Sequence, residues 1–513
     1  MINQRSRTKN SIMNILVGVG SQVIILILTF ISRTIFINTL GAEYLGVNGL
    51  YTNILTVLSL AELGIGNVMI YSLYKPMAEN NIDKIRSLLG YYRSLYSKIS
   101  ISIFSIGLFI VPFLGNIVNS DLDHDKLILY YVFFLANTAI SYLVVYKTIL
   151  INADQKNRIV RLVYTATVIL RELIQIIVLI FFQNYLLFLF VMILSTVANN
   201  LVISSKANSL YPFIKKIESK KEKSNEIHEI NQNIKSAFVY KIGAVLMNNT
   251  DNILISIILG TVFVGYYSNY SMIVLAVQAI IGILIQAIFS SVGNLNAKED
   301  KQKSFDFFNV LLFFFHFLTA VCSICFLLIF NDFIITWIGS EYVLELNVVV
   351  AISFNFYIQN IINPVWIYRE TLGLFKDVKK LMLFAAFVNL LLSVVFGFLF
   401  GLSGIIVSTA LARIVTTVWF EPKILYRKVF EISVRQYWKR QLKYLFLTVC
   451  AAALSYYLTL GLSTSILTII IKIIITLLVT CLIFVLTSYK TKEFRILTNY
   501  ALKLNPIKKF KRK

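Results

Sequence analysis

Long apolar segments alternate with short polar segments along the whole chain. Each apolar segment is close to the roughly 20 residues that an α-helix needs to cross the hydrocarbon core of a bilayer. Fourteen segments qualify, at 12–37, 52–73, 99–118, 127–150, 160–182, 185–205, 236–259, 265–292, 306–330, 347–366, 378–400, 403–421, 442–460 and 466–487. Two connections are very short hairpins, at Gln183-Asn184 and Gly401-Leu402. The pattern predicts an all-α integral membrane protein with 14 transmembrane helices.

Basic residues are confined to alternate connections between these segments. If the N-terminus is cytoplasmic, the segments on that side, counted together with the first three residues of the span that follows each, hold 41 of the 48 lysines and arginines, whereas the opposite side holds only Lys126. The opposite loops are instead acidic, with Asp121, Asp123, Asp125, Glu341 and Glu345. Because membrane proteins keep Lys and Arg in their cytoplasmic loops, we expect a cytoplasmic-membrane protein with both termini in the cytoplasm.

The composition excludes several other classes of protein. Of the 513 residues, 58% are hydrophobic, which is far above the apolar content of soluble globular proteins. The mean hydropathy is +0.77. The net charge of +23 is explained by the loop pattern, so we expect no nucleic-acid partner. Four cysteines lie in apolar stretches and three histidines are scattered, which predicts no metal site or cofactor. No catalytic motif is present, so we expect a transporter rather than an enzyme.

The chain also contains an internal repeat. The sequence LGAEYLG at 40–46, which precedes Tyr51, matches LGTVFVG at 259–265, which precedes Tyr270, at a constant shift of 219 positions. Both Leu-Gly pairs fall where a helix ends, and glycine suits a left-handed cap there. We therefore expect two six-helix lobes in parallel repeat, a recurring transporter design. The predicted parts are an N-lobe at 1–205, a cytoplasmic linker at 206–235, a C-lobe at 236–425, and two further helices with a basic cytoplasmic tail at 426–513.

Five ionisable residues lie deep in the predicted spans, namely Glu62, Arg171, Glu172, Asp251 and Arg413. Each costs about 2.5–3.5 kcal/mol near the bilayer centre unless it is paired or faces water. Because Arg171 and Glu172 are adjacent and point about 100° apart on a helix, we expect that they do not satisfy each other. Two interpretations remain open: structural ion pairs between helices, and a polar central pathway. We favour the pathway because the repeat is typical of transporters.

Four other basic residues, Arg33, Lys147, Lys241 and Lys472, are weaker candidates for the pathway. They lie nearer to span ends, where long side chains can reach the membrane interface.

Several motifs resemble those of Wzx-type polysaccharide flippases. These motifs are SRT at 32–34, LGAEYLGVNGL at 40–50 and LAELGIG at 60–66, with TDNILIS at 250–256 and GYYSNY at 265–270 as counterparts in the second half. Such flippases belong to the multidrug/oligosaccharidyl-lipid/polysaccharide exporter superfamily, which also holds multidrug (MATE) exporters and lipid II flippases. The likeness in topology covers the whole chain.

The resemblance implies a flippase for undecaprenyl-diphosphate-linked oligosaccharide repeat units. It would move them from the inner to the outer leaflet of the bacterial cytoplasmic membrane for capsule, exopolysaccharide or O-antigen assembly, by alternating access through a cationic central cavity. Arg33 matches the arginine of the family pattern in the first span. By position alone, Arg171, Lys241, Arg413 and Lys472 are assigned to the same cavity. The implied partners are the lipid-linked glycan, membrane lipid and the polysaccharide polymerase machinery.

The acidic residues Glu62, Glu172 and Asp251 would couple transport to H⁺ or Na⁺, or release the substrate from the arginines. The first alternative function is a MATE-like multidrug or cation antiporter, which would need an acidic cavity, whereas these spans hold more basic than acidic groups. The second is a membrane polysaccharide polymerase, which would usually have a large outer loop.

Overall fold

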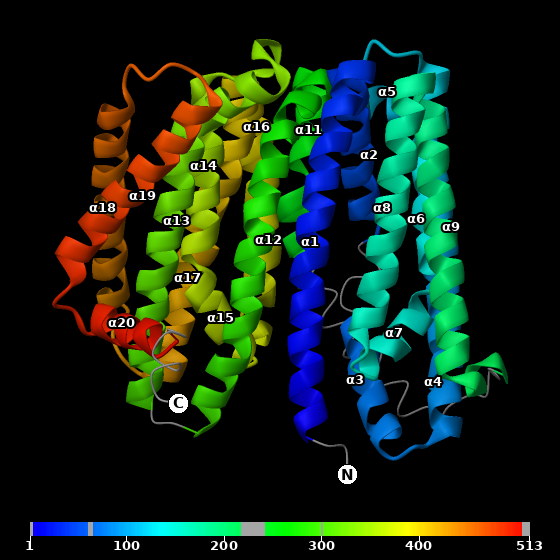
Figure 1. Cartoon of the computed structure of the whole chain (residues 1–513), viewed down its shortest axis with the longest axis horizontal. Coiled ribbons are helices and arrows are strands. Elements are labelled where there is room, and N and C mark those ends of the chain that lie inside the picture. The colour runs from blue at the N-terminus through cyan, green and yellow to red at the C-terminus, as the bar shows by residue number, and fades with distance from the viewer. Residues whose placement is uncertain (1–3, 60–64, 217–241, 299–300, 505–513) are drawn as a thin grey trace. The chain divides into compact units, whose positions relative to one another are not determined.

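The protein is an all-α, multi-pass membrane protein, as predicted. The computed structural model describes residues 4–59, 65–216, 242–298 and 301–504, and this part of the chain contains helices and no β-strand (Figure 1). Eleven of the described helices are long and apolar enough to cross a membrane, or 12 if one bent pair forms a single span. The predicted count of 14 spans is compatible with this result. One of the 11 helices contains a chain reversal, and the predicted span 52–73 includes residues 60–64, which lie outside the described part of the chain.

The chain divides into two compact units, Met1–Ser268 and Asn269–Lys513. We call them unit 1 and unit 2. The predicted division at 1–205, 206–235 and 236–425 stays a prediction, and residues 217–241 of the predicted linker lie outside the described part of the chain.

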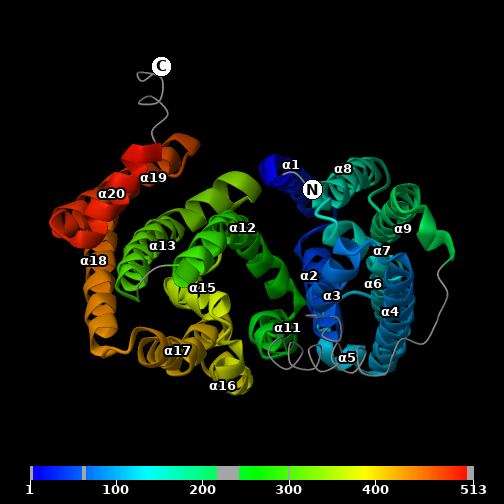
Figure 2. The same ribbon diagram turned by 90° about the horizontal axis from the view of Figure 1, so that it is seen from below.

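Unit 1 is a bundle in which α8 packs on both α1 and α9, and α6 packs on both α4 and α9 (Figure 2). Its helices are α1 (Gln4–Leu40), α2 (Ala42–Leu58), α3 (Ile65–Ala78), α4 (Ile82–Ile110), α5 (Leu114–Ile117), α6 (His124–Tyr142), α7 (Val145–Ala153), α8 (Asn157–Phe182), α9 (Tyr185–Leu210), α11 (Asp251–Leu259) and the start of α12 (Thr261–Lys298). The hairpin between α8 and α9 falls at Gln183-Asn184, as predicted. Gln183 takes a left-handed conformation, and the Asn184 side chain caps α9 by accepting from the Leu187 amide.

Unit 2 is built around α13, which packs against α14, α18, α19 and α20. Its helices are α13 (Lys301–Ile338), α14 (Leu346–Ile361), α15 (Asn363–Thr371), α16 (Phe375–Val415), α17 (Thr417–Leu425), α18 (Arg435–Thr459), α19 (Ile466–Ser488) and α20 (Lys492–Leu504).

The helix α16 contains two spans that run in opposite directions. Gly401 interrupts it with φ 61° and ψ −139°. Across this break, the side-chain amide of Asn389 donates to the Thr409 hydroxyl at 2.9 Å. Twenty residues of continuous helix would separate such groups by about 30 Å, so the chain must reverse between them. The reversal lies at the predicted Gly401-Leu402 hairpin.

The repeated Leu-Gly pairs end their helices with the same backbone conformation. Gly41 has φ 87° and ψ 178°, and Gly260 has φ 109° and ψ 153°. The expected left-handed cap is therefore wrong, because ψ lies near 180° rather than near 45°. This region of backbone space is essentially restricted to glycine, so both positions require that residue.

Immediately after these turns, the starts of α2 and α12 cross in direct backbone contact. A Cβ added to Gly46 would lie 1.9 Å from the Thr261 carbonyl oxygen, and one added to Gly265 would lie 2.1 Å from the Ala42 carbonyl oxygen. The contact is reciprocal, because Ala42 and Gly46 are the repeat partners of Thr261 and Gly265. Small residues four apart allow such close helix crossings in membranes. The structure thus supports the internal repeat at residue level within unit 1.

Candidate functional site

A polar pocket of about 200 Å³ lies within unit 1, among α1, α2, α8 and α9. Three of the residues predicted to line a pathway meet there: Arg33 from α1, and Arg171 and Glu172 from α8. The other polar lining residues are Thr29, Ser32, Asn48 and Gln175. The pocket therefore combines two guanidinium groups with one carboxylate inside a membrane-spanning bundle.

Arg33 is held by the first turns of α12. Its guanidinium donates to the Ser268 hydroxyl, which in turn donates to the Gly265 carbonyl oxygen at 2.7 Å. Gly265 is one of the two glycines at the α2–α12 crossing. The position of the Arg33 head group thus depends on the close approach that these glycines permit.

The expectation that Arg171 and Glu172 would not satisfy each other is wrong. The Arg171 Nη2 atom lies 2.5 Å from the Glu172 Oε1 atom. The expectation considered only the directions in which the two Cβ atoms leave the helix, but the long Arg171 side chain folds back to its neighbour. The Nε atom of Arg171 remains buried without a hydrogen-bond partner. A buried donor of this kind favours water or an anionic ligand in the pocket.

Four neutral polar residues of the pocket, Thr29, Ser32, Asn48 and Gln175, were not predicted to line it, because only charged groups stood out in the apolar spans. Gln175 is 2% exposed, and its amide nitrogen donates to the Phe188 carbonyl oxygen at 2.9 Å. This bond joins α8 to α9 beside the pocket, since both residues line it. The available signal was helical spacing, because Gln175 follows Arg171 by four positions and so shares its face.

The pocket has a net charge of +1 if all three ionisable groups are charged. Its volume equals that of about seven water molecules at about 30 Å³ each, and it is smaller than the 300–1,000 Å³ typical of drug-sized ligands. It therefore has room for a phosphate-sized anion but not for an oligosaccharide. Within the described residues, no group of three or more His, Cys, Asp or Glu residues is placed to hold a metal ion.

Asp251 is buried at the start of α11 and does not line this pocket. The helical segment before it is interrupted at Thr250, where the side chains of Asn248, Asn249 and Thr250 donate back to carbonyl oxygens four residues earlier. Asp251 therefore lies in the first turn of a helix, where the helix dipole stabilises a negative charge. Of the remaining predicted residues in this half, Glu62 and Lys241 lie outside the described residues.

Arg413 lies in unit 2, where it contacts neutral amides. It is 7% exposed, and its Nη1 atom donates to Asn355 Oδ1 at 3.0 Å and to Gln359 Oε1 at 3.3 Å. Both partners belong to α14 and lie one helical turn apart. The assignment of Arg413 to a cationic cavity stays a prediction.

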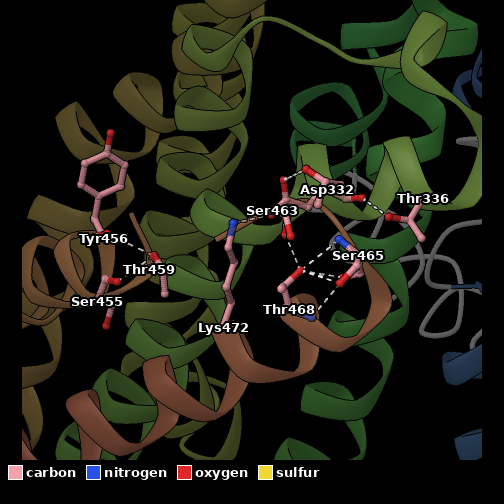
Figure 3. Close-up of polar contacts among 10 residues, drawn as sticks. Asp332, Thr336, Ser455, Tyr456, Thr459, Ser463, Ser465, Thr468 and Lys472 are labelled. Atoms are coloured by element: carbon pink, nitrogen blue, oxygen red, sulfur yellow. Dashed lines mark hydrogen bonds and ion pairs between the residues drawn. The ribbon is translucent and has the colours of Figure 1, made fainter. Parts of the chain in front are cut away.

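Lys472 lies on α19 and forms an ion pair with Asp332 on α13, with 2.5 Å between Nζ and Oδ2 (Figure 3). The Thr464 hydroxyl also donates to Asp332, at 3.2 Å. Nearby, Ser465 and Thr468 form a capping box at the start of α19. These contacts match the structural-pair interpretation for this lysine, while its assignment to a substrate cavity stays a prediction.

A more deeply buried ion pair in unit 2 was not predicted. Arg369 on α15 contacts Glu421 on α17 at 2.6 Å, and both side chains are only 4% exposed. Arg369 also contacts Glu370, at 2.8 Å. Arg369 lies beyond the end of the predicted span 347–366, but α15 carries it into the protein interior. The interruption by Asn363 and Pro364 was the available signal for this separate helix.

The fold is shared with known lipid and drug transporters. The lipid II flippase MurJ in an inward closed conformation has a TM-score of 0.68 at 14% identity, covering 92% of this chain and 98% of that chain. An inward-facing multidrug resistance MATE family transporter of the MOP superfamily has a TM-score of 0.62 at 13% identity, covering 79% and 97%. A variant of the Vibrio cholerae MATE transporter VcmN has a TM-score of 0.55 at 12% identity, covering 83% and 99%. No protein-family model matches the sequence, and no curated protein is similar to it.

Proposed function

We propose that this protein is a flippase for undecaprenyl-diphosphate-linked oligosaccharide repeat units. It would move them from the inner to the outer leaflet of the bacterial cytoplasmic membrane, for assembly of capsule, exopolysaccharide or O-antigen. The observation that carries the proposal is the pocket in unit 1, where Arg33 and Arg171 lie together. The fold shared with MurJ and the Wzx-like motif that contains Arg33 support the same function.

The chemistry of the pocket suits a diphosphate. A charged phosphate that crosses hydrocarbon without a partner meets a large desolvation penalty. Guanidinium groups reduce this penalty because their planar donors match phosphate oxygens in a forked geometry. The pocket accommodates only the phosphate end, so the glycan must lie outside it. Release requires that binding is loose, which fits alternating access between two conformations.

The test is transport of a labelled polyprenyl-diphosphate glycan into the outer leaflet of proteoliposomes. We expect Arg33→Gln and Arg171→Gln each to reduce the transport rate at least tenfold. Arg158→Gln is the matched control, because this arginine lies on α8 but outside the pocket. Melting temperatures would confirm that all three variants fold. Wild-type rates in both pocket variants would overturn the proposal.

A MATE-like multidrug or cation antiporter is the second candidate. The observation in its favour is Glu172, a carboxylate that is 5% exposed and lines the pocket. This function predicts efflux of organic cations that depends on Glu172 and not on Arg33. Comparing Glu172→Gln with Arg33→Gln in a cation-efflux assay distinguishes the two functions.

The remaining features of the proposal are the orientation, the coupling and the partners. Both termini would lie in the cytoplasm, as the distribution of basic residues indicates. An H⁺ or Na⁺ ion, or the membrane potential alone, would drive transport. The partners would be the lipid-linked glycan, membrane lipid and the polysaccharide polymerase machinery.

A further inference from the structure

Unit 1 contains a second polar cavity, of about 260 Å³, among α6, α7, α8 and α9. The polar residues that line it are Ser141, Thr148, Asn157, Arg161, Asn199 and Asn200. The cavity lies where α6 gives way to α7 with a bend of 42°. Broken helices with polar surroundings are where transporters commonly bind ions and polar groups.

This cavity lies on the same helix faces as the Arg33–Arg171 pocket. On α8, Tyr164 lines the cavity and Arg171 lines the pocket, seven residues further on. On α9, Asn199 lines the cavity and Met192 lines the pocket, again seven residues apart. Seven residues make almost two full helical turns, so each pair shares a face and is separated by about 10 Å along the helix. The cavity lies nearer to the start of α8 and the end of α9.

Polar side chains bridge the interval between the two sites. The Ser195 hydroxyl donates to the Thr167 carbonyl oxygen at 3.2 Å, and the Thr167 hydroxyl donates to the Asn199 side chain at 3.5 Å. The Thr196 hydroxyl donates to the Asn137 side-chain oxygen at 2.6 Å. Polar contacts of α9 with α8 and with α6 therefore lie between the two sites.

The cavity offers a positive charge and hydrogen-bond donors but no negative charge. Arg161 is exposed, and within the described part of the chain it forms no ion pair. No carboxylate lines the cavity. The first turn of α7 contributes Val145 and Thr148, so the positive end of that helix dipole also lies there. An anion is the ligand that this arrangement favours.

The surroundings of the cavity indicate a lipid as the source of that anion. Leu162 and Tyr164 are about half exposed beside it, on a surface that faces hydrocarbon or interface in a membrane protein. Arg161 lies in the second turn of α8, close to two further basic residues, Lys156 just before the helix and Arg158 in its first turn. This is the end of the helix that the distribution of basic residues predicts to be cytoplasmic. A phosphate at headgroup depth in the inner leaflet would be within reach of Arg161.

We infer that this cavity is a docking site for the phosphate-bearing headgroup of an inner-leaflet lipid, which includes the diphosphate of the transported lipid before it reaches Arg33 and Arg171. The docking site stands on the cavity and its charge. Its role in loading the substrate rests on the proposed flippase function.

The binding test is native mass spectrometry of the purified, delipidated full-length protein. The probes are phosphatidylglycerol, a diacylglycerol glycolipid without phosphate, and inorganic pyrophosphate. We expect Arg161→Gln to weaken binding of one phosphatidylglycerol molecule at least tenfold, while Arg158→Gln, an equal loss of charge outside the cavity, leaves it unchanged. Wild-type affinity in Arg161→Gln, an equal loss in Arg158→Gln, or equal binding of the glycolipid overturns the inference.

The pyrophosphate arm distinguishes the two sources of phosphate. If pyrophosphate competes poorly, the lipid headgroup is the ligand, as inferred. If it binds as tightly as phosphatidylglycerol in an Arg161-dependent way, the ligand is water-borne phosphate and the assignment to a lipid is overturned.

The loading role predicts a separate kinetic signature. Arg161→Gln should raise the half-saturating concentration of labelled glycan lipid about tenfold and leave the maximal rate unchanged, whereas Arg33→Gln lowers the maximal rate. A loss of maximal rate in Arg161→Gln would overturn the loading role. If the wild type transported no glycan lipid but bound phosphatidylglycerol through Arg161, the proposed function would fail and the docking site would stand.

Discussion

Glu172 reduces the positive charge of the unit 1 pocket but does not cancel it, because two arginines line the same pocket. Its carboxylate accepts a hydrogen bond from the Nη2 atom of Arg171 at 2.5 Å, while the buried Nε atom of the same guanidinium has no hydrogen-bond partner. Arg171 therefore keeps a donor for a ligand although it is already paired. Under the proposed flippase function, Glu172 would be the group that keeps binding weak enough for release.

The change Glu172→Gln tests this role. It preserves the shape of the side chain and raises the net charge of the pocket by one. We expect binding of a diphosphate lipid to tighten about tenfold, which corresponds to about 1.4 kcal/mol, and the maximal transport rate to fall because release is slower. Lipid titration and single-turnover transport of the same preparation measure both quantities. Weaker binding in this variant would show that the carboxylate helps to hold the ligand.

At the residue scale, the charged part of the site was predictable and the neutral part was not. Arg33, Arg171 and Glu172 stand out because a charge in an apolar segment needs an explanation. Asn48 and Gln175 carry no such penalty signal, so nothing in the pattern separates them from other polar residues in spans. The pairing of Arg171 with its neighbour depends on side-chain conformation, which sequence spacing does not encode.

At the scale of elements, the crossing of α2 and α12 depends on two glycines. An alanine at position 46 or 265 would place its Cβ about 2 Å from a backbone carbonyl oxygen, so the helices would have to separate. We expect Gly46→Ala and Gly265→Ala each to lower the free energy of unfolding by at least about 1–3 kcal/mol, the usual cost of overpacking a protein core. We also expect them to reduce transport, because Arg33 is held by Ser268 on the same stretch of α12. Melting temperature in detergent measures the first effect.

Gly282→Ala is the matched control on α12, because no atom lies within 4 Å of the Cβ it would add. Alanine is favoured over glycine in a helix by up to about 1 kcal/mol, so this variant should melt at or slightly above the wild-type temperature. If Gly265→Ala and Gly282→Ala melted alike, the close crossing would not exist in the membrane protein.

The pair of Lys472 and Asp332 joins α19 to α13 and provides a second test at this scale (Figure 3). Removing one partner of a buried pair costs about 3–5 kcal/mol, whereas replacing both with apolar residues is often nearly neutral. We expect Lys472→Met alone to lower the melting temperature, and the double variant Lys472→Met with Asp332→Leu to restore it together with transport. A double variant that folds but transports nothing would instead assign Lys472 to the substrate path.

The elements themselves were predictable wherever polarity or glycine marks their ends. The Gly401 reversal and the Gln183-Asn184 hairpin fall where the apolar pattern is interrupted. The bend between α6 and α7 was not predicted, because Leu143 and Val144 continue the apolar run. A helix break that the packing of neighbouring helices stabilises leaves no mark of its own in hydropathy.

At the scale of the whole molecule, the membrane fold followed from the alternation of apolar and charged segments. The internal repeat, with its shift of 219 positions, was inferred from only a few identical residues. The structure explains one matched pair, Gly46 and Gly265, by the close packing of α2 on α12. The contacts of Arg413 with α14 and the residues that meet in the unit 1 pocket could not be predicted. Contacts between distant segments depend on tertiary packing, which a periodic pattern does not specify.

The net charge carried by the substrate gives the last prediction. Moving an anion out of a compartment with a negative potential is favourable by about 2.3 kcal/mol per charge per 100 mV. If the potential alone drives export, an inside-negative potential of about 100 mV in proteoliposomes should raise the outer-to-inner ratio of labelled glycan lipid about 50-fold per charge moved, at equal pH and Na⁺ on both sides. Collapsing the potential with a potassium ionophore at equal K⁺ should return the ratio to that set by passive exchange. Accumulation that persists at zero potential but needs a Na⁺ or pH gradient would show that ion coupling drives transport, and Glu172 and Asp251 would then be the first residues to substitute.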